Sequence, residues 1–135
     1  YGGSRSVWGS TNNDIWNLAI DLDNGKFYAG KNGSYYGEDG NTSNPATASN
    51  PGYAITANRF GDSNTKYNYQ IFIGLRNDGS ETNGIYLNQG NPNGNFAITS
   101  NSGDGYADAN GYGKFQYQPP SGYYAMCTKN LKQYG

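Results

Sequence analysis

The amino-acid sequence predicts an all-β protein, an antiparallel β-sandwich, in a chain of 135 residues. Leu, Ile, Val and Phe account for only 18 residues. Aromatic residues nevertheless reach 16% and the formal net charge is −1, a combination that favours a folded chain over a disordered one. Asn-Gly turn signals recur along the chain, and apolar and polar residues alternate between them. About seven such short runs indicate a sandwich.

The first hairpin is predicted over residues 17–33 (NLAIDLDNGKFYAGKNG), where apolar and polar residues alternate up to an Asn-Gly step. Asn-Gly favours the two positive φ angles of a two-residue type I′ turn. That turn pairs Leu22 with Phe27 on an apolar face and Asp23 with Lys26 on a polar, outward face. A second Asn-Gly step follows the returning strand. The expected turn residues are Asn24, Gly25, Asn32 and Gly33.

The other predicted strands are short. The run 41–51 (NTSNPATASNP) holds two Asn-Pro steps and no apolar periodicity, so we expect an exposed excursion there. The hydrophobic run QIFIGL and the run IYLN predict a second hairpin. Short strands are expected at 53–57, 70–75, 85–88, 95–99 and 114–118. Helical periodicity is missing before residue 123, and residues 125–131 predict at most a short helical turn.

Composition and charge exclude several classes of protein. No run approaches the ~18 apolar residues of a membrane helix, and nine scattered basic residues argue against nucleic-acid binding. The lack of histidine excludes Ser-His-Asp catalysis and His-ligated metals, and one cysteine excludes an internal disulfide. The chain opens YGGSRSVWGS, without a signal peptide or initiator Met, so we expect a processed product or a segment of a longer protein.

The acidic residues are weak candidates for catalytic or metal-binding groups. Asp21 and Asp23 are carboxylates of the kind that act as a catalytic acid/base pair. We favour the interpretation that they only lie on the outward face of a hairpin. The loop 103–113 (GDGYADANGYG) and the run 39–43 have the acid-and-amide composition of a calcium loop without the EF-hand spacing. We therefore expect no catalytic residue, no metal and no cofactor.

Aromatic side chains are the candidate ligand-binding groups, namely Tyr35, Tyr36, Tyr53 and Trp8. Tyr and Trp combine a flat apolar body with a polar tip, which suits sugar rings or partner proteins. Asn-rich loops with Tyr are also typical of adaptable binding loops. The alternative is that most aromatic residues fill the core, because few aliphatic side chains are present, and Trp16 is expected there.

The predicted hairpin resembles the central signature of SPRY domains, in which an aspartate-rich strand end turns into a strand that finishes in K-N-G. The matching residues are Asp21, Asp23, Gly25, Lys26, Tyr28, Lys31, Asn32 and Gly33. Residues 109–131 (ANGYGKFQYQPPSGYYAMCTKNL) are similar to the closing segment of such modules in tailed-phage structural proteins, where T-K-N-L leads toward the next domain. The run IYLNQGNP resembles the usual V-N-F-G-N-P turn, with Gln89 in place of Phe.

The resemblance covers residues 14–33 and 85–131. A full SPRY sandwich has several strands before this hairpin, whereas 13 residues precede it here. Either the chain is the C-terminal part of a longer polypeptide, or another subunit completes the sheets; we favour the first. The expected domains are 1–122, the C-terminal part of a SPRY-like sandwich, and 123–135, an exit segment or linker.

The resemblance implies a non-enzymatic structural or adhesion module of a tailed-phage virion, such as a capsid decoration, tail or fibre domain. It would display the Tyr/Asn-rich loops 34–53 and 76–84. Expected partners are other virion proteins, further copies of the chain and a host-surface glycan or protein, without nucleic acid or membrane insertion. Two alternatives are a carbohydrate-binding module of a secreted bacterial protein and a purely structural assembly subunit with no ligand. An enzyme would need two carboxylates converging in a cleft.

Overall fold

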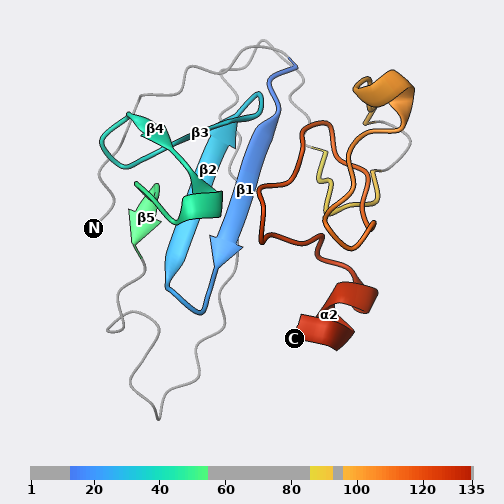
Figure 1. The fold of residues 1–135 in the computed structure, drawn as a ribbon. Coiled ribbons are helices and arrows are strands. Elements are labelled where there is room, and N and C mark those ends of the chain that lie inside the picture. Colours follow the sequence, from blue (N-terminus) through green and yellow to red (C-terminus); the bar gives the residue numbers. More distant parts are fainter. Residues whose placement is uncertain (1–12, 55–85, 93–95, 135) are drawn as a thin grey trace, which may run out of the picture.

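The structure, a computed structural model, describes residues 13–54, 86–92 and 96–134 (Figure 1). Its elements are β1 (Trp16–Asp21), β2 (Lys26–Lys31), β3 (Ser34–Tyr36), β4 (Thr42–Ser43), the 3-10 helix η1 (Pro45–Thr47), β5 (Tyr53–Ala54), the 3-10 helix η2 (Asn101–Gly103) and α2 (Thr128–Tyr134). Trp8, the predicted strand 70–75 and the loop 76–84 lie outside the described residues. Within the described ranges, no helix is long and apolar enough to cross a membrane.

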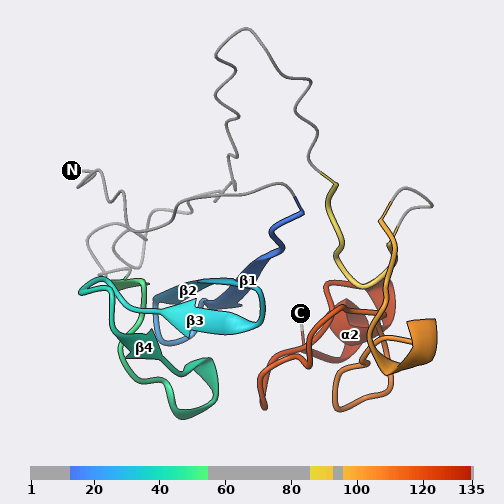
Figure 2. The ribbon, with the colours of Figure 1, turned by 90° about the horizontal axis from the view of Figure 1, so that it is seen from above.

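The strands form one antiparallel sheet in the order β1-β2-β3-β4, and β5 pairs with β2 beside β3. Figures 1 and 2 show the C-terminal part, which ends in α2, next to β1. The predicted antiparallel, mostly β character is confirmed. The described elements make a single open sheet, so the sandwich stays a prediction.

The β1–β2 hairpin closes through a four-residue loop instead of the predicted two-residue turn. Asp21 pairs with Lys26, and Gly25 N donates to Leu22 O at 3.3 Å. The Asp21 carboxylate accepts from both the backbone N (3.0 Å) and the side-chain Nδ2 (2.8 Å) of Asn24, so Asn24 stays out of positive φ and only Gly25 adopts it (61°). The register moves by two residues, which leaves every side chain on its predicted face.

The face of the hairpin that was predicted to be exposed is buried, and the face that was predicted to be buried is partly exposed. Ala19 and Tyr28 form a cross-strand pair and are 5% and 0% exposed, although their face was expected to point outward. Tyr123 from the C-terminal part meets Tyr28 edge-on, with ring centroids 6.2 Å apart. The apolar partner face stays open, and Trp16, expected in the core, is 44% exposed.

The C-terminal part is held by turns more than by strands. Residues 86–88 and 96–99 fall in predicted strands but have no strand structure, and 114–118 contribute a single bridge, between Tyr106 and Phe115. Glycines with positive φ, among them Gly90, Gly103, Gly105 and Gly113, lie between these runs, where they permit tight turns. Helix α2 overlaps the helical turn predicted over 125–131, but it begins at Thr128 and continues to Tyr134.

Candidate functional site

The predicted aromatic surface is divided between the two faces of the sheet. Tyr35 and Tyr36 are neighbours in β3, and successive strand residues point to opposite faces. Tyr35 pairs with Gly30 and with Ser43 on the buried face, where burial raises the pKa of Tyr35 to about 12. Tyr36 pairs with Ala29 and therefore lies on the other face. These two residues do not form one binding surface.

The face that carries Tyr36 is broad, apolar and partly open. Paired residues in antiparallel strands share a face, so β5 brings Tyr53 opposite Phe27 onto the same side. We call this the apolar sheet face; its residues are Trp16, Leu18, Ile20, Phe27, Ala29, Tyr36 and Tyr53. Leu18, Ile20 and Tyr53 are 38%, 37% and 36% exposed. Lys31 pairs with Trp16 and lies on the same face.

Residues 37–51 form a loop, here called the display loop, that is fixed by its own side chains. The Asp39 carboxylate accepts from Asn41 N, Asn41 Nδ2 and Asn50 Nδ2, each at 2.9 Å. The hydrogen bonds from Asn50 and Asn41 lower the pKa of Asp39 to about 2. Asn50 Nδ2 also donates to Thr42 O at 3.2 Å. The two ends of the loop are thereby joined at Asp39.

The tip of the display loop is closed and tied to the sheet. Asn44 caps η1 by accepting from Ala46 N at 3.0 Å, and Asn44 and Ser49 exchange two backbone hydrogen bonds of 3.2 and 3.1 Å. Lys26 Nζ donates to Ala48 O at 2.9 Å, which links β2 to the loop. Many of the loop's Asn and Asp side chains thus fix its own backbone, and the loop presents a defined shape.

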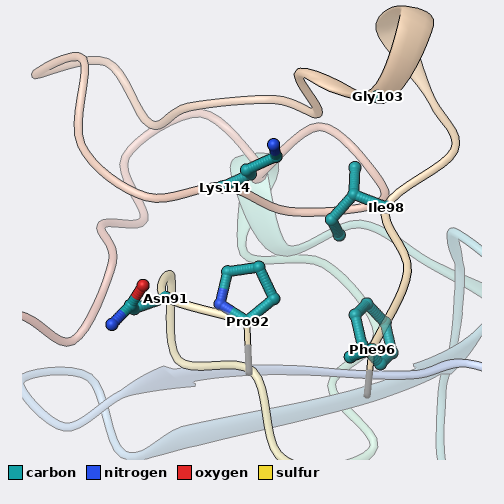
Figure 3. Close-up of a pocket in the computed structure, with 6 residues that line it drawn as sticks. All are labelled: Asn91, Pro92, Phe96, Ile98, Gly103 and Lys114. Carbon is teal, nitrogen blue, oxygen red and sulfur yellow. The ribbon is translucent and has the colours of Figure 1, made fainter. Parts of the chain in front are cut away.

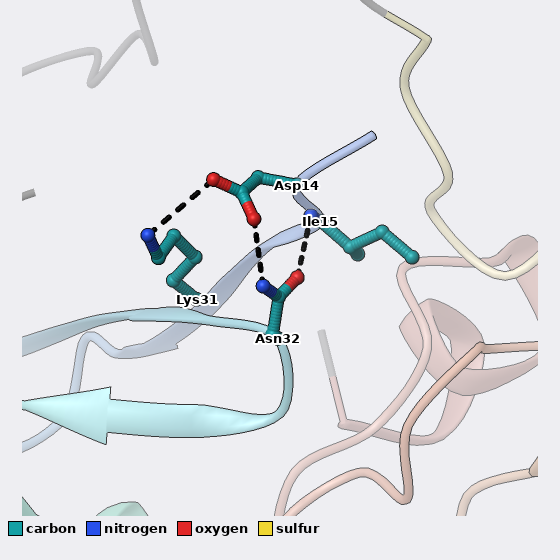
Figure 4. A network of polar contacts seen from close by, with 4 residues as sticks. All are labelled: Asp14, Ile15, Lys31 and Asn32. Atoms are coloured by element: carbon teal, nitrogen blue, oxygen red, sulfur yellow. Dashed lines mark hydrogen bonds and ion pairs between the residues drawn. The ribbon is translucent and has the colours of Figure 1, made fainter. Parts of the chain in front are cut away.

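The Lys-Asn-Gly turn after β2 is locked to the residues before β1 (Figure 4). Asn32 Nδ2 donates to Asp14 Oδ1 at 2.7 Å, and Asn32 Oδ1 accepts from Ile15 N at 2.9 Å. Lys31 Nζ lies 3.3 Å from Asp14 Oδ2. Asn32 and Gly33 adopt φ of 51° and 86°, so the two-residue turn with two positive φ angles occurs here. Asn32 and Gly33 act as structural turn residues.

Asp108, in the calcium-like loop, is the centre of a buried hydrogen-bond network. Its carboxylate accepts from Ala125 N (2.8 Å), Asn130 Nδ2 (2.7 Å), Asn110 N (2.9 Å) and Tyr112 N (2.9 Å). Burial acts to raise the pKa of Asp108, but these hydrogen bonds outweigh it and hold the pKa below its usual value. Both oxygens are occupied by N–H donors, and the described residues contain no cluster of three or more acidic or cysteine ligands.

Of the four aromatic residues singled out from the sequence, the structure brings Tyr36 and Tyr53 onto one face, places Tyr35 on the other, and does not describe Trp8. Sequence reasoning missed Trp16 and Ile20 as surface residues because their alternation was assigned to the core. The available signal was the small residues of the opposite face, which permit close packing. No family model matches the chain, and no curated protein or solved structure matches it.

Proposed function

We propose that the chain is a non-enzymatic module of a tailed-phage virion, structural or adhesive, built on a SPRY-like β-sandwich. The antiparallel sheet and the similarity of the hairpin and the T-K-N-L segment to phage SPRY modules support this proposal. Its presenting element is the display loop; the second predicted loop, 76–84, lies outside the described residues.

The observation that carries the proposal is the preorganisation of the display loop. A loop that is ordered before it meets a partner loses less conformational entropy on binding, so less of the contact energy is spent on ordering it. Here Asp39 joins the two ends and Lys26 ties the tip to β2. Such a loop suits recognition of a polar surface, because its exposed groups keep a fixed spacing.

The test is adhesion of the labelled full chain to a panel of bacterial strains, measured by flow cytometry. Asp39→Ala removes the acceptor that joins Asn41 and Asn50, and we expect it to weaken cell binding several-fold. Asp23→Ala is the matched control, because Asp23 is an exposed turn carboxylate outside the display loop. The proposal fails if the chain binds no cells and antibodies against it find no epitope on purified phage particles.

The apolar sheet face favours a second candidate, a purely structural assembly subunit whose neighbouring copies cover this face. A net charge of −1 puts little electrostatic repulsion between copies. Sedimentation velocity over a range of concentrations tests this: Ile20→Ser should reduce association, whereas Met126→Ser, at an exposed apolar residue of the C-terminal part, should not. A chain that is monomeric at every concentration rules this candidate out.

A further inference from the structure

The described residues offer two candidates for a further functional element. The first is a pocket of about 290 Å³ in the C-terminal part, which Figure 3 shows beside Lys114. Its lining is mostly polar and open to solvent, so we assign it no ligand. The second is the tip of the display loop, residues 44–49, where the backbone is strained. The tip is the stronger candidate, because defined contacts hold it.

The strain lies at Ala48, in a backbone conformation that an alanine rarely adopts. Ala48 is the C-terminal cap of η1 and has φ of 53° and ψ of 30°, in the left-handed region. In that region the Cβ of an L-residue crowds the following carbonyl oxygen. A strained residue persists only where its surroundings hold it there, and such residues cluster at ligand clamps and switch regions. The contacts of Ala48 therefore indicate what holds the tip.

Two kinds of hydrogen bond hold the tip. Within it, Ala48 N donates to Pro45 O at 3.0 Å, and Asn44 O accepts from Ser49 N at 3.1 Å. These bonds close the tip but do not attach it to β2. Lys26 makes that attachment, because its Nζ donates to Ala48 O at 2.9 Å in a partly buried position. Both polar groups of the Ala48 backbone are thus engaged, one inside the tip and one by β2.

The position of Lys26 in the hairpin directs its side chain to the loop. Lys26 begins β2 and, by strand alternation, lies on the same buried face as Tyr28. Asp21 is opposite Lys26 in the β1–β2 ladder, but its carboxylate oxygens accept from Asn24 at 3.0 and 2.8 Å. A hydrogen bond from an ammonium group is stronger than one between neutral groups. The bond to Ala48 O is therefore suited to hold a strained residue in place.

We propose that Lys26 is a positioning residue for adhesion, and that its bond to Ala48 O holds the tip of the display loop in a conformation that the backbone would otherwise leave. Without this bond, Ala48 would return to more favourable backbone angles and the tip would sample several arrangements. A partner would then have to order the tip on binding, which weakens the affinity. This inference rests on the proposed adhesion function and adds the residue outside the loop that controls it.

The experiment combines ¹⁵N NMR relaxation of the full chain with the cell-adhesion measurement. Lys26→Met removes the ammonium and keeps an unbranched side chain. We expect it to lower the amide order parameters of residues 46–49 from about 0.85 to below about 0.6, to leave those of β1 and β2 near 0.85, and to weaken adhesion several-fold. Lys26→Arg keeps a charged donor and should retain both properties. Lys132→Met, at an exposed lysine of α2, is the control and should change neither.

Unchanged order parameters of residues 46–49 in Lys26→Met overturn the inference. Wild-type adhesion by a Lys26→Met chain whose tip has lost its order also overturns it, because the tip would then not need to be positioned. Failure of the proposed function gives a different result. If the wild-type chain adheres to no strain, the adhesion function is wrong, whereas a loss of order confined to residues 46–49 of Lys26→Met still supports the hold of Lys26 on the tip.

Discussion

At the scale of single residues, Asp108 and Asn130 are the centre of a buried hydrogen-bond network. Both side chains are buried, at 5% and 3% exposure. Asn130 Nδ2 donates to the Asp108 carboxylate and to Ala125 O, and Asn130 Oδ1 accepts from Asn110 Nδ2 at 2.9 Å. A buried carboxylate is stable when its oxygens accept several hydrogen bonds. The pair therefore joins the loop 108–112 to the segment that leads into α2.

This network makes the protein sensitive to acid. The pKa of Asp108 is lowered in the folded state relative to about 3.8 in the unfolded chain, so its contribution to stability is present above about pH 4 and lost as the pH falls through the folded pKa. We expect the urea midpoint to be flat from pH 7 to 5 and to fall below pH 4. Asp108→Asn should be less stable at pH 7 and show a smaller fall. An equal fall in the variant would contradict this role for Asp108.

At the scale of elements, the sequence predicted the hairpin and the face of each residue, because alternation alone determines which side chains share a side. It predicted a turn at Asn24 and Gly25 but not its four-residue form, in which the Asp21 carboxylate accepts from the backbone and side-chain amides of Asn24. Periodicity also overpredicted a strand in 96–99, since it does not report whether a partner strand is available. The display loop was predicted as an excursion, but its internal hydrogen bonds depend on contacts such as Asp39 to Asn50, 11 residues apart.

Gly33 provides a test of the two-residue turn. Its φ is 86°, and an added Cβ would lie 2.8 Å from Tyr117 Cδ1. Gly122 has nearly the same φ, 85°, with no atom within 4 Å of an added Cβ, so it is a matched control for backbone strain. We expect Gly122→Ala to lower the free energy of unfolding by about 1 kcal/mol and Gly33→Ala to lower it by more. Equal losses in urea denaturation would show that Tyr117 moves aside without cost.

At the scale of the whole molecule, the buried face of the sheet carries Ala19, Tyr28, Gly30 and Tyr35. Alternation identifies two faces but does not say which one a distant segment covers. Gly30 is required by the close approach of β3, because an added Cβ there would overlap the Ser34 carbonyl oxygen, and it leaves this face without a side chain at that position. With Ala19 beside it, this face admits the Tyr28 ring and the edge of Tyr123. The aliphatic residues of β1 are left on the open side, available for contacts outside the described residues.

One substitution on each face of the sheet tests which face contributes more to the free energy of unfolding. Tyr28 is fully buried, so Tyr28→Ala should lower the free energy of unfolding by about 3–5 kcal/mol. Ile20 is more than a third exposed, and Ile20→Ala should lower it by less than about 2 kcal/mol. Urea denaturation of both variants gives the comparison. A larger loss for Ile20→Ala would mean that the aliphatic face is the core.

The hydrogen bonds made by Asn32 affect the rate at which this residue deamidates. Asn-Gly steps are prone to deamidation, in which the glycine nitrogen attacks the asparagine side-chain carbonyl and ammonia leaves; asparagine counts among the thermolabile residues for this reason. At this step Gly33 N donates to Asn17 Oδ1 at 3.0 Å, while both ends of the Asn32 amide are held by Asp14 and Ile15. Peptide mapping after prolonged incubation should find Asn32 intact in the folded chain and converted to aspartate and isoaspartate in the urea-unfolded chain. The hydrogen bonds that shape the turn thereby also slow its chemical decay.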